Sequence, residues 1–169
     1  MEYWMQGPLS GIPALVQPVA HVLKQLQKEV HECMLDFPEN LLYERPFGRA
    51  SVGFHLLHIG GVIDRMFTYA EGKMLNDRQF RELEEEKLHS KSLEELLRHL
   101  DDNIGSALGK LSEVDQSTLT ETRYLGRKRI PVTLMGLLFH SAEHSMRHLG
   151  QLIVTVSALK QQKHPPIPE

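Results

Sequence analysis

Cysteine is nearly absent from this sequence, and this limits both its redox chemistry and its expected environment. Cys33 is the only cysteine among 169 residues, so no disulfide can form within the chain. Disulfides belong to oxidising compartments, so a reducing one is the natural expectation here. Cys33 lies in the helical pattern EVHECMLDF, where a single thiol more often packs as a small apolar group than acts as a nucleophile. We therefore interpret it as a packing residue.

The chain also lacks an excess of either charge and any long apolar run. Its 19 basic and 22 acidic residues leave a formal charge of −3, whereas nucleic-acid-binding domains normally present a strongly basic face. No stretch reaches the roughly 20 apolar residues that cross a bilayer. The N-terminal MEYWMQGPLSG lacks the charged and apolar regions of a signal peptide. We expect a cytoplasmic protein that binds neither nucleic acid nor membrane.

Apolar residues at helical spacing are what the chain does contain. Its length and its 41% apolar content suit one domain with a real core. Four stretches carry an apolar residue every three or four positions, which marks one face of an amphipathic helix. These stretches are residues 14–38, 51–74, 92–111 and 131–161. We predict an all-α four-helix bundle forming a single domain over residues 1–169, with its core at about 14–160.

Capping residues and glycines mark particular points on these helices. Ser51 is a candidate N-cap for the second helix, and Ser92 with Glu95 forms a capping-box pattern at the start of the third. Gly60 and Gly61 lie inside the second helix, where each destabilises it by about 1 kcal/mol relative to alanine. Two such residues together indicate close approach by another helix or by a bound group.

Two connections separate the later helices. Residues 75–91 are polar and predict a long connection with a helical turn or two between the second and third helices. The stretch TETRYLGRKRIPV predicts a short hairpin before the fourth helix. Pro131, at its end, suits the first turn of that helix, where a missing N–H is tolerated.

Histidine is abundant, and three histidines share one face of the fourth helix. The stretch HSAEHSMRHLGQL places His140, His144 and His148 four residues apart. Positions four apart advance about 40° around a helix, so the three imidazoles lie within an arc of about 80°. Because apolar residues such as Leu137 and Leu152 share this arc, the histidines lie on or beside the core face. A buried imidazole there needs partners for its nitrogens.

His58, in FHLLHIGG on the second helix, is a candidate partner for this row. Two histidines four apart can share a metal ion, and a third from a facing helix completes a three-nitrogen site with one open position. That is the arrangement of a catalytic zinc site. For any single histidine, however, a hydrogen-bonded or surface role is the commoner one. Spacing alone leaves the two alternatives open.

The histidine-bearing segments together resemble a known family. LLHIGG, followed by GRKRIPVTLMGLLFH and then by the H-x-x-x-H-x-G-Q of AEHSMRHLGQL, resembles the DinB/YfiT-like superfamily, whose members are regarded as metalloenzymes. The resemblance spans roughly residues 14–160. It implies a four-helix bundle with up-down-down-up connectivity, consistent with the long connection in the middle. Dimerisation is common in such bundles, and we expect a homodimer.

By position, the resemblance implies a divalent metal, most often zinc or nickel, held by His58, His144 and His148. His55 and His140 then become contacts of the ligands or spare imidazoles. A further departure is Leu149, which stands where the family usually has arginine.

The resemblance also implies a class of reaction on a small-molecule substrate. Members with understood activity are mainly transferases or isomerases that use a low-molecular-weight thiol such as bacillithiol or mycothiol. A divalent cation lowers the pKa of a coordinated thiol, so a thiol-dependent S-transferase acting on small electrophiles is the first expectation. The same ion could activate water in a metal-dependent hydrolase.

Two further alternatives remain: a metal-binding or stress-response protein without turnover, and a metal-free structural bundle. No catalytic acid or base is evident from the sequence. Asp64 points about 240° around the helix from His58, and Glu143 about 100° from His144.

The basic residues of the hairpin offer one more interpretation. Arg123, Arg127, Lys128 and Arg129 could attract the carboxylates of a thiol, or they could simply be solvated surface charges, which is the commoner case.

Overall fold

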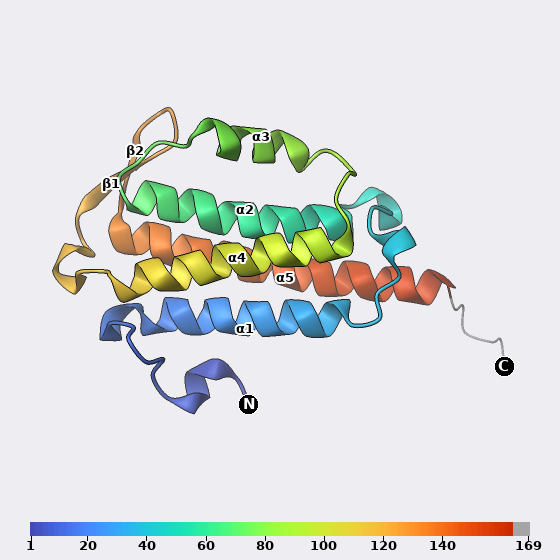
Figure 1. The fold of residues 1–169 in the computed structure, drawn as a ribbon, viewed down its shortest axis with the longest axis horizontal. Coiled ribbons are helices and arrows are strands. Elements are labelled where there is room, and N and C mark those ends of the chain that lie inside the picture. The colour runs from blue at the N-terminus through green and yellow to red at the C-terminus, as the bar shows by residue number, and fades with distance from the viewer. Residues whose placement is uncertain (164–169) are drawn as a thin grey trace.

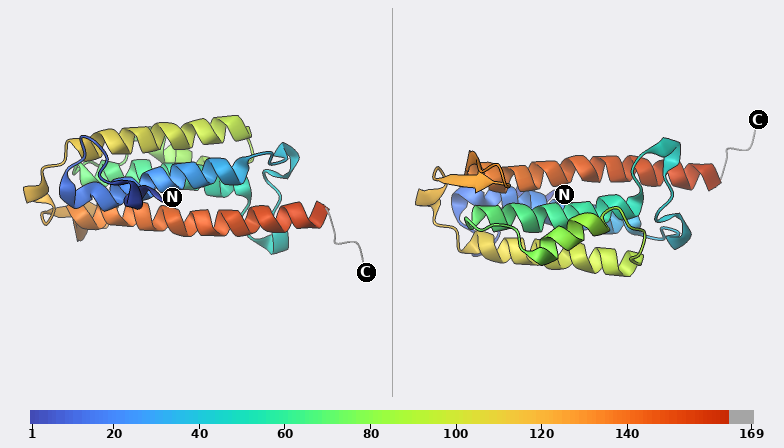
Figure 2. Two further views of the ribbon diagram at one scale, coloured as in Figure 1. Left: turned by 90° about the horizontal axis from the view of Figure 1, so that it is seen from below. Right: turned by 90° about the horizontal axis from the view of Figure 1, so that it is seen from above.

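The computed structural model describes residues 1–163, which contain five α-helices and one two-stranded sheet. Four of the helices form the bundle (Figure 1). They are α1 (Gln17–Met34), α2 (Val52–Ala70), α4 (Leu93–Ser112) and α5 (Leu134–Lys163). The fifth, α3 (Asp77–Glu85), lies against α2 outside the bundle (Figure 2). Residues 164–169 lie outside the described part of the chain.

The direction of the helices explains the long central connection. In Figure 1, α2 and α4 run the same way, and α1 and α5 run the opposite way. The chain must therefore return along the bundle between α2 and α4. This connection contains more helix than the turn or two expected, because α3 has nine residues. A capping box opens α3: the Asn76 side chain accepts the Gln79 N–H at 3.1 Å, and the Gln79 side chain accepts the Asn76 N–H at 3.0 Å.

The predicted caps of two bundle helices are confirmed. Ser51 Oγ accepts the Phe54 N–H at 3.2 Å at the start of α2. At the start of α4, Ser92 Oγ accepts the Glu95 N–H at 3.2 Å. The Glu95 carboxylate accepts the Ser92 N–H at 2.7 Å in return. Each cap satisfies amide N–H groups that have no partner inside the helix.

The predicted place of Pro131 in the fourth helix is wrong. The hairpin consists of β1 (Thr122–Leu125) and β2 (Ile130–Thr133), and Pro131 pairs with Tyr124 within it. A two-stranded ribbon has free edges, where a missing N–H is tolerated. Helix α5 starts only at Leu134, and the Thr133 hydroxyl accepts the Gly136 N–H at 3.0 Å. A threonine cap therefore replaces the expected proline.

The apolar stripes of the four helices meet in one core. Its largest fully buried side chains include Leu23, Leu26, Leu56, Ile59, Ile63, Leu96, Leu100, Ile104, Leu138 and Leu149. Leu149, the departure from the family pattern, thus belongs to the core of α5. Cys33 packs against this core, and burial raises the pKa of its thiol, as a packing role requires.

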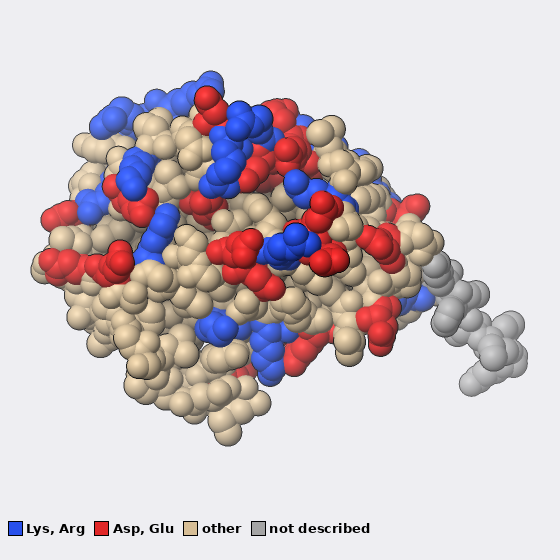
Figure 3. All heavy atoms as spheres, in the orientation of Figure 1, with Lys and Arg blue, Asp and Glu red and all other residues tan. Residues whose placement is uncertain are grey.

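One face of the molecule matches the balanced composition. On the face shown in Figure 3, acidic and basic side chains are interspersed over α3 and α4. Nowhere in residues 1–163 does a helix combine the length and apolar character that spanning a membrane requires.

The two adjacent glycines of α2 lie where neighbours come too close for a side chain. A Cβ on Gly60 would lie 2.8 Å from Cδ2 of His99 and 3.4 Å from the Cα of Leu100, both on α4. The expected close approach of another helix is therefore confirmed at Gly60. It lets α4 pack closely against α2, two residues beyond His58.

Gly60→Leu tests this contact against a matched control. We expect it to lower the free energy of unfolding by about 2 kcal/mol or more, because the added side chain overpacks the α2–α4 interface. Gly105→Leu places the same change on an exposed face of α4 where nothing lies within 4 Å, and should raise stability by up to about 1 kcal/mol. Urea unfolding of both variants measures the difference. Equal effects would show that the glycine serves no close packing.

Candidate metal centre

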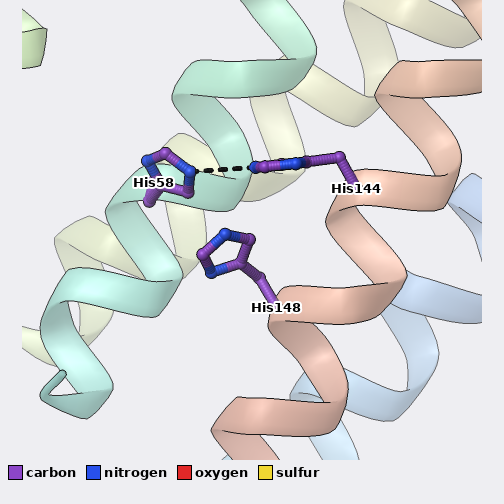
Figure 4. A group of neighbouring side chains, drawn as sticks. All are labelled: His58, His144 and His148. Carbon is purple, nitrogen blue, oxygen red and sulfur yellow. Dashed lines mark hydrogen bonds between the residues drawn. The ribbon is translucent and has the colours of Figure 1, made fainter. Parts of the chain in front are cut away.

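Three histidines from two helices face one another across the α2–α5 interface (Figure 4). They are His58 on α2 and His144 and His148 on α5, and we call them the three-histidine group. One nitrogen from each can be chosen so that all three lie within 4.8 Å of one another. The Nε2 atoms of His58 and His144 are 3.1 Å apart, close to the roughly 3.3 Å expected for two nitrogens on one tetrahedral zinc ion. The donors and their spacing therefore fit one divalent cation.

The position of the group follows from the helix packing. His144 and His148 are one turn apart, so both project from α5 toward α2 (Figure 4). All three side chains are partly buried, between the core and the solvent. A ligand can therefore reach the group from outside while apolar packing fixes its base.

Glu86 fixes the orientation of His58. Its Oε2 lies 2.8 Å from Nδ1 of His58. An ionised carboxylate only accepts, so Nδ1 carries the proton and the lone pair is left on Nε2, facing His144. Burial alone would raise the pKa of Glu86, but the hydrogen bond from His58 and the charge of Arg65 outweigh it, and the pKa is lowered. The carboxylate is therefore charged at neutral pH.

Arg65 holds Glu86 in place. Its Nη2 donates to Glu86 Oε1 at 2.8 Å, and both side chains are less than one-tenth exposed. Gly61 makes room for this pair: a Cβ there would lie 2.6 Å from Nη1 of Arg65 and 3.3 Å from Glu86 Oε1. The second glycine of LLHIGG thus serves the centre rather than the helix packing.

Sequence reasoning missed Glu86. It lies at the end of α3, in a polar stretch where Glu84 and Glu85 precede it, and no spacing relates it to His58. The two carboxylates considered from the sequence have other partners. Asp64 accepts from Gln79 at 2.7 Å and from Arg78 at 2.9 Å, away from His58 as predicted. Glu143 accepts from Arg147.

His55 contacts the opposite side of the group. Its Nδ1 lies 3.1 Å from Nδ1 of His148, and it is only 2% exposed. Burial, followed by the nearby His58, lowers the pKa of both His55 and His148 to about 4. Both are therefore neutral at pH 7. A neutral His55 can accept a proton from Nδ1 of His148, which leaves Nε2 of His148 free for a cation.

His140 and the hairpin cations lie further out. The His140 side chain is 45% exposed, with Nδ1 3.7 Å from Glu143, and its ring centroid is 5.2 Å from that of His144. Arg123 donates to the backbone carbonyl of Ala70 at the end of α2, about 18 Å along the helix from His58. The hairpin therefore does not adjoin the three-histidine group.

Comparison with known proteins agrees with the resemblance seen in the sequence. A family model described as the DinB superfamily matches residues 22–152. YfiT from Bacillus subtilis, described as a probable metal-dependent hydrolase with an unusual four-helix bundle topology, superposes with a TM-score of 0.64. The two sequences are 15% identical, and the match covers 91% of this chain and 93% of YfiT. A Streptococcus pneumoniae protein from structural genomics superposes with a TM-score of 0.64 and is 14% identical. The match covers 95% of this chain and 97% of the Streptococcus protein. Comparison with curated protein sequences finds no match.

Glu86→Gln tests how the carboxylate supports the centre. The amide cannot hold the Nδ1 proton of His58 as a carboxylate does, so we expect affinity for zinc to fall by about ten- to a hundred-fold. Competition with a chromophoric chelator measures the affinity, and circular dichroism checks the fold, because Arg65 loses its buried partner. Glu84→Gln, which changes an exposed neighbour that pairs with Lys87, is the control and should bind as the wild type does. Equal affinities of the two variants would remove Glu86 from the centre.

The low pKa values of His55 and His148 predict acid sensitivity of the metal-free protein. Both pKa values lie near 4 in the folded chain, against about 6.5 in an unfolded one. The unfolded state therefore binds more protons between these values, and the free energy of unfolding falls as pH drops from about 6.5 to about 4. Urea titrations at several pH values in the presence of a chelator measure the slope. His55→Asn should make the slope shallower; an unchanged slope would contradict the assignment.

Proposed function

Because this chain belongs to the DinB superfamily, we propose that it is a metal-dependent enzyme whose cation, zinc or nickel, is held by His58, His144 and His148. The observation that carries the proposal is the convergence of three imidazole nitrogens within 4.8 Å on two facing helices. Three neutral nitrogen donors leave a fourth position open, as in catalytic rather than structural zinc sites.

The reaction that we propose is transfer of a low-molecular-weight thiol, such as bacillithiol, to a small electrophile. A divalent cation at this position would lower the pKa of a thiol, or of water, bound at the open position. Cys33, the only cysteine in the sequence, is not suited to this role. Cys33 lies on α1, packed against the core, with a raised pKa, so it is a poor thiolate source. The thiol would therefore come from the co-substrate.

The surrounding residues would hold the ligands rather than transfer protons. Glu86 accepts the Nδ1 proton of His58, and Arg65 keeps that carboxylate ionised. Phe54 stacks on the His58 ring, with centroids 5.2 Å apart and an angle of 13°, and so shields one face of the imidazole from water.

A metal-dependent hydrolase is the second candidate. Its support is the similarity of fold to YfiT, which is described as a probable hydrolase of this kind. In that case water would occupy the open position. A protein that holds the metal without turnover is the third candidate, since among the described residues the acids and bases that contact the three-histidine group are other histidines and Glu86.

Metal content is the first test. Tag-free protein purified without added metal should carry close to one zinc or nickel ion per chain by elemental mass spectrometry. The double variant His144→Ala, His148→Ala should carry none. His140→Ala is the matched control, because it removes the third histidine of the same helical row, which is 45% exposed, and should keep the metal. Equal content in all three proteins would refute the site.

Turnover then separates the candidate functions. The S-transferase predicts metal-dependent consumption of a thiol with a model electrophile, lost in the His144→Ala, His148→Ala protein. The hydrolase predicts metal-dependent cleavage of model esters or amides without thiol. A loaded protein inactive in both assays would favour the non-catalytic alternative.

A further inference from the structure

A cleft of about 690 Å³ opens next to His55. Its walls come from two parts of the chain: Arg49, just before α2, with His55 on α2, and Arg147, Gln151 and Thr155 on α5. His55 connects the cleft to the centre, because its Nδ1 lies 3.1 Å from Nδ1 of His148. A molecule in the cleft would therefore be separated from His148, a candidate ligand of the metal, by the His55 ring.

The charge of the cleft has one sign. No acidic residue lines it, and its two charged residues are arginines. Arg147 is held by Glu143, with Nε 2.6 Å from one carboxylate oxygen and Nη2 2.8 Å from the other, so its charge is largely balanced. Arg49 has no ion-pair partner in the part of the chain that the structure describes. Its guanidinium is the free positive charge of the cleft.

Neutral donors complete the lining. Thr155 is only 6% exposed, and neither its hydroxyl nor the Gln151 amide has a hydrogen bond to any described residue. The Thr155 hydroxyl and the exposed Gln151 amide are thus available to a bound molecule.

The loop that carries Arg49 is held in an unusual conformation. Phe47 adopts φ 53° and Gly48 φ 69°, and Phe47 is 83% exposed. A phenylalanine in the left-handed region is strained, and such strain persists only where surrounding contacts fix it. Arg45 supplies them: its Nε donates to the Arg49 carbonyl at 3.1 Å and its Nη2 to the Gly48 carbonyl at 3.4 Å. The loop therefore keeps Arg49 at the edge of the cleft.

We propose, resting on the metal-dependent function above, that this cleft binds the anionic part of the ligand, a small molecule with one or more carboxylates. Arg49 supplies the charge, since a guanidinium matches a carboxylate in both charge and geometry. Thr155 and Gln151 supply neutral hydrogen bonds. The rest of the ligand would extend toward the three-histidine group, which the His55 ring separates from the cleft. The carboxylates belong either to the thiol or to the electrophile, and both sources use the same contacts.

Calorimetric binding of three probes tests the proposal. Succinate offers carboxylates alone, 2-mercaptoethanol a thiol alone, and mercaptosuccinate both. Each is titrated into metal-loaded and chelator-treated protein. We expect succinate to bind in both forms, because the cleft requires no metal. Arg49→Gln should weaken succinate binding at least ten-fold and leave 2-mercaptoethanol unaffected. Arg98→Gln is the matched control: it removes an exposed arginine on α4 that pairs with Glu94, and should bind as the wild type does.

The outcomes separate the cleft from the metal chemistry. Tighter binding of mercaptosuccinate than of succinate, in the metal-loaded form only, would assign the carboxylates to the thiol. Equal binding of the two would assign them to the electrophile. Arg49-dependent succinate binding in a protein that binds neither metal nor thiol would support the cleft and refute the proposed function. Absence of succinate binding, or equal binding by the Arg49→Gln and Arg98→Gln proteins, would overturn the cleft itself.

Discussion

The contact between α2 and α5 is the constraint on which the rest of the molecule depends. It places Nε2 of His58 3.1 Å from Nε2 of His144, although the two residues are far apart in the chain. Neither helix could hold three nitrogens around one ion alone, because one helix face presents only neighbours at successive turns. Side chains next to the histidines in the sequence, such as Leu56, Ile59 and Leu149, are fully buried. The hydrophobic core thus fixes the distance on which the metal chemistry would rely.

Charge is arranged around this contact in two layers. Nearest the histidines lie two proton acceptors, the anionic Glu86 beside His58 and the neutral His55 beside His148. Both favour the tautomer that leaves an Nε2 lone pair for a cation. Behind Glu86 lies Arg65, which pairs with the carboxylate and so reduces the cost of burying it. Gly61 makes room for this ion pair, so a residue without a side chain supports a centre that it does not touch.

The parts of this arrangement predictable from the sequence are those determined locally. Ser51, Ser92 and Glu95 cap their helices as their spacing indicates, because an N-cap depends only on residues within one turn. The histidine row projects to one face for the same reason. Glu86 at the centre and Arg49 at the cleft were not predictable, since the path of a connection places each of them. Pro131 shows a local rule being overridden: pairing with Tyr124 extends the hairpin past the expected helix start.

The charges also bear on which ligands the centre would accept. Three neutral imidazoles leave the charge of a dication uncompensated among its ligands, and Glu86, the adjacent carboxylate, is already paired with Arg65. The positive charge of a bound dication would therefore extend to the open position and to the adjoining cleft, where Arg49 adds to it and no acidic residue forms part of the lining. Low-dielectric surroundings strengthen such fields. A centre of this kind favours a ligand that arrives as an anion, whether as a thiolate, through carboxylates, or both, over a neutral molecule of the same shape. The same electrostatics would thus govern the proposed reaction at the metal and the proposed binding in the cleft.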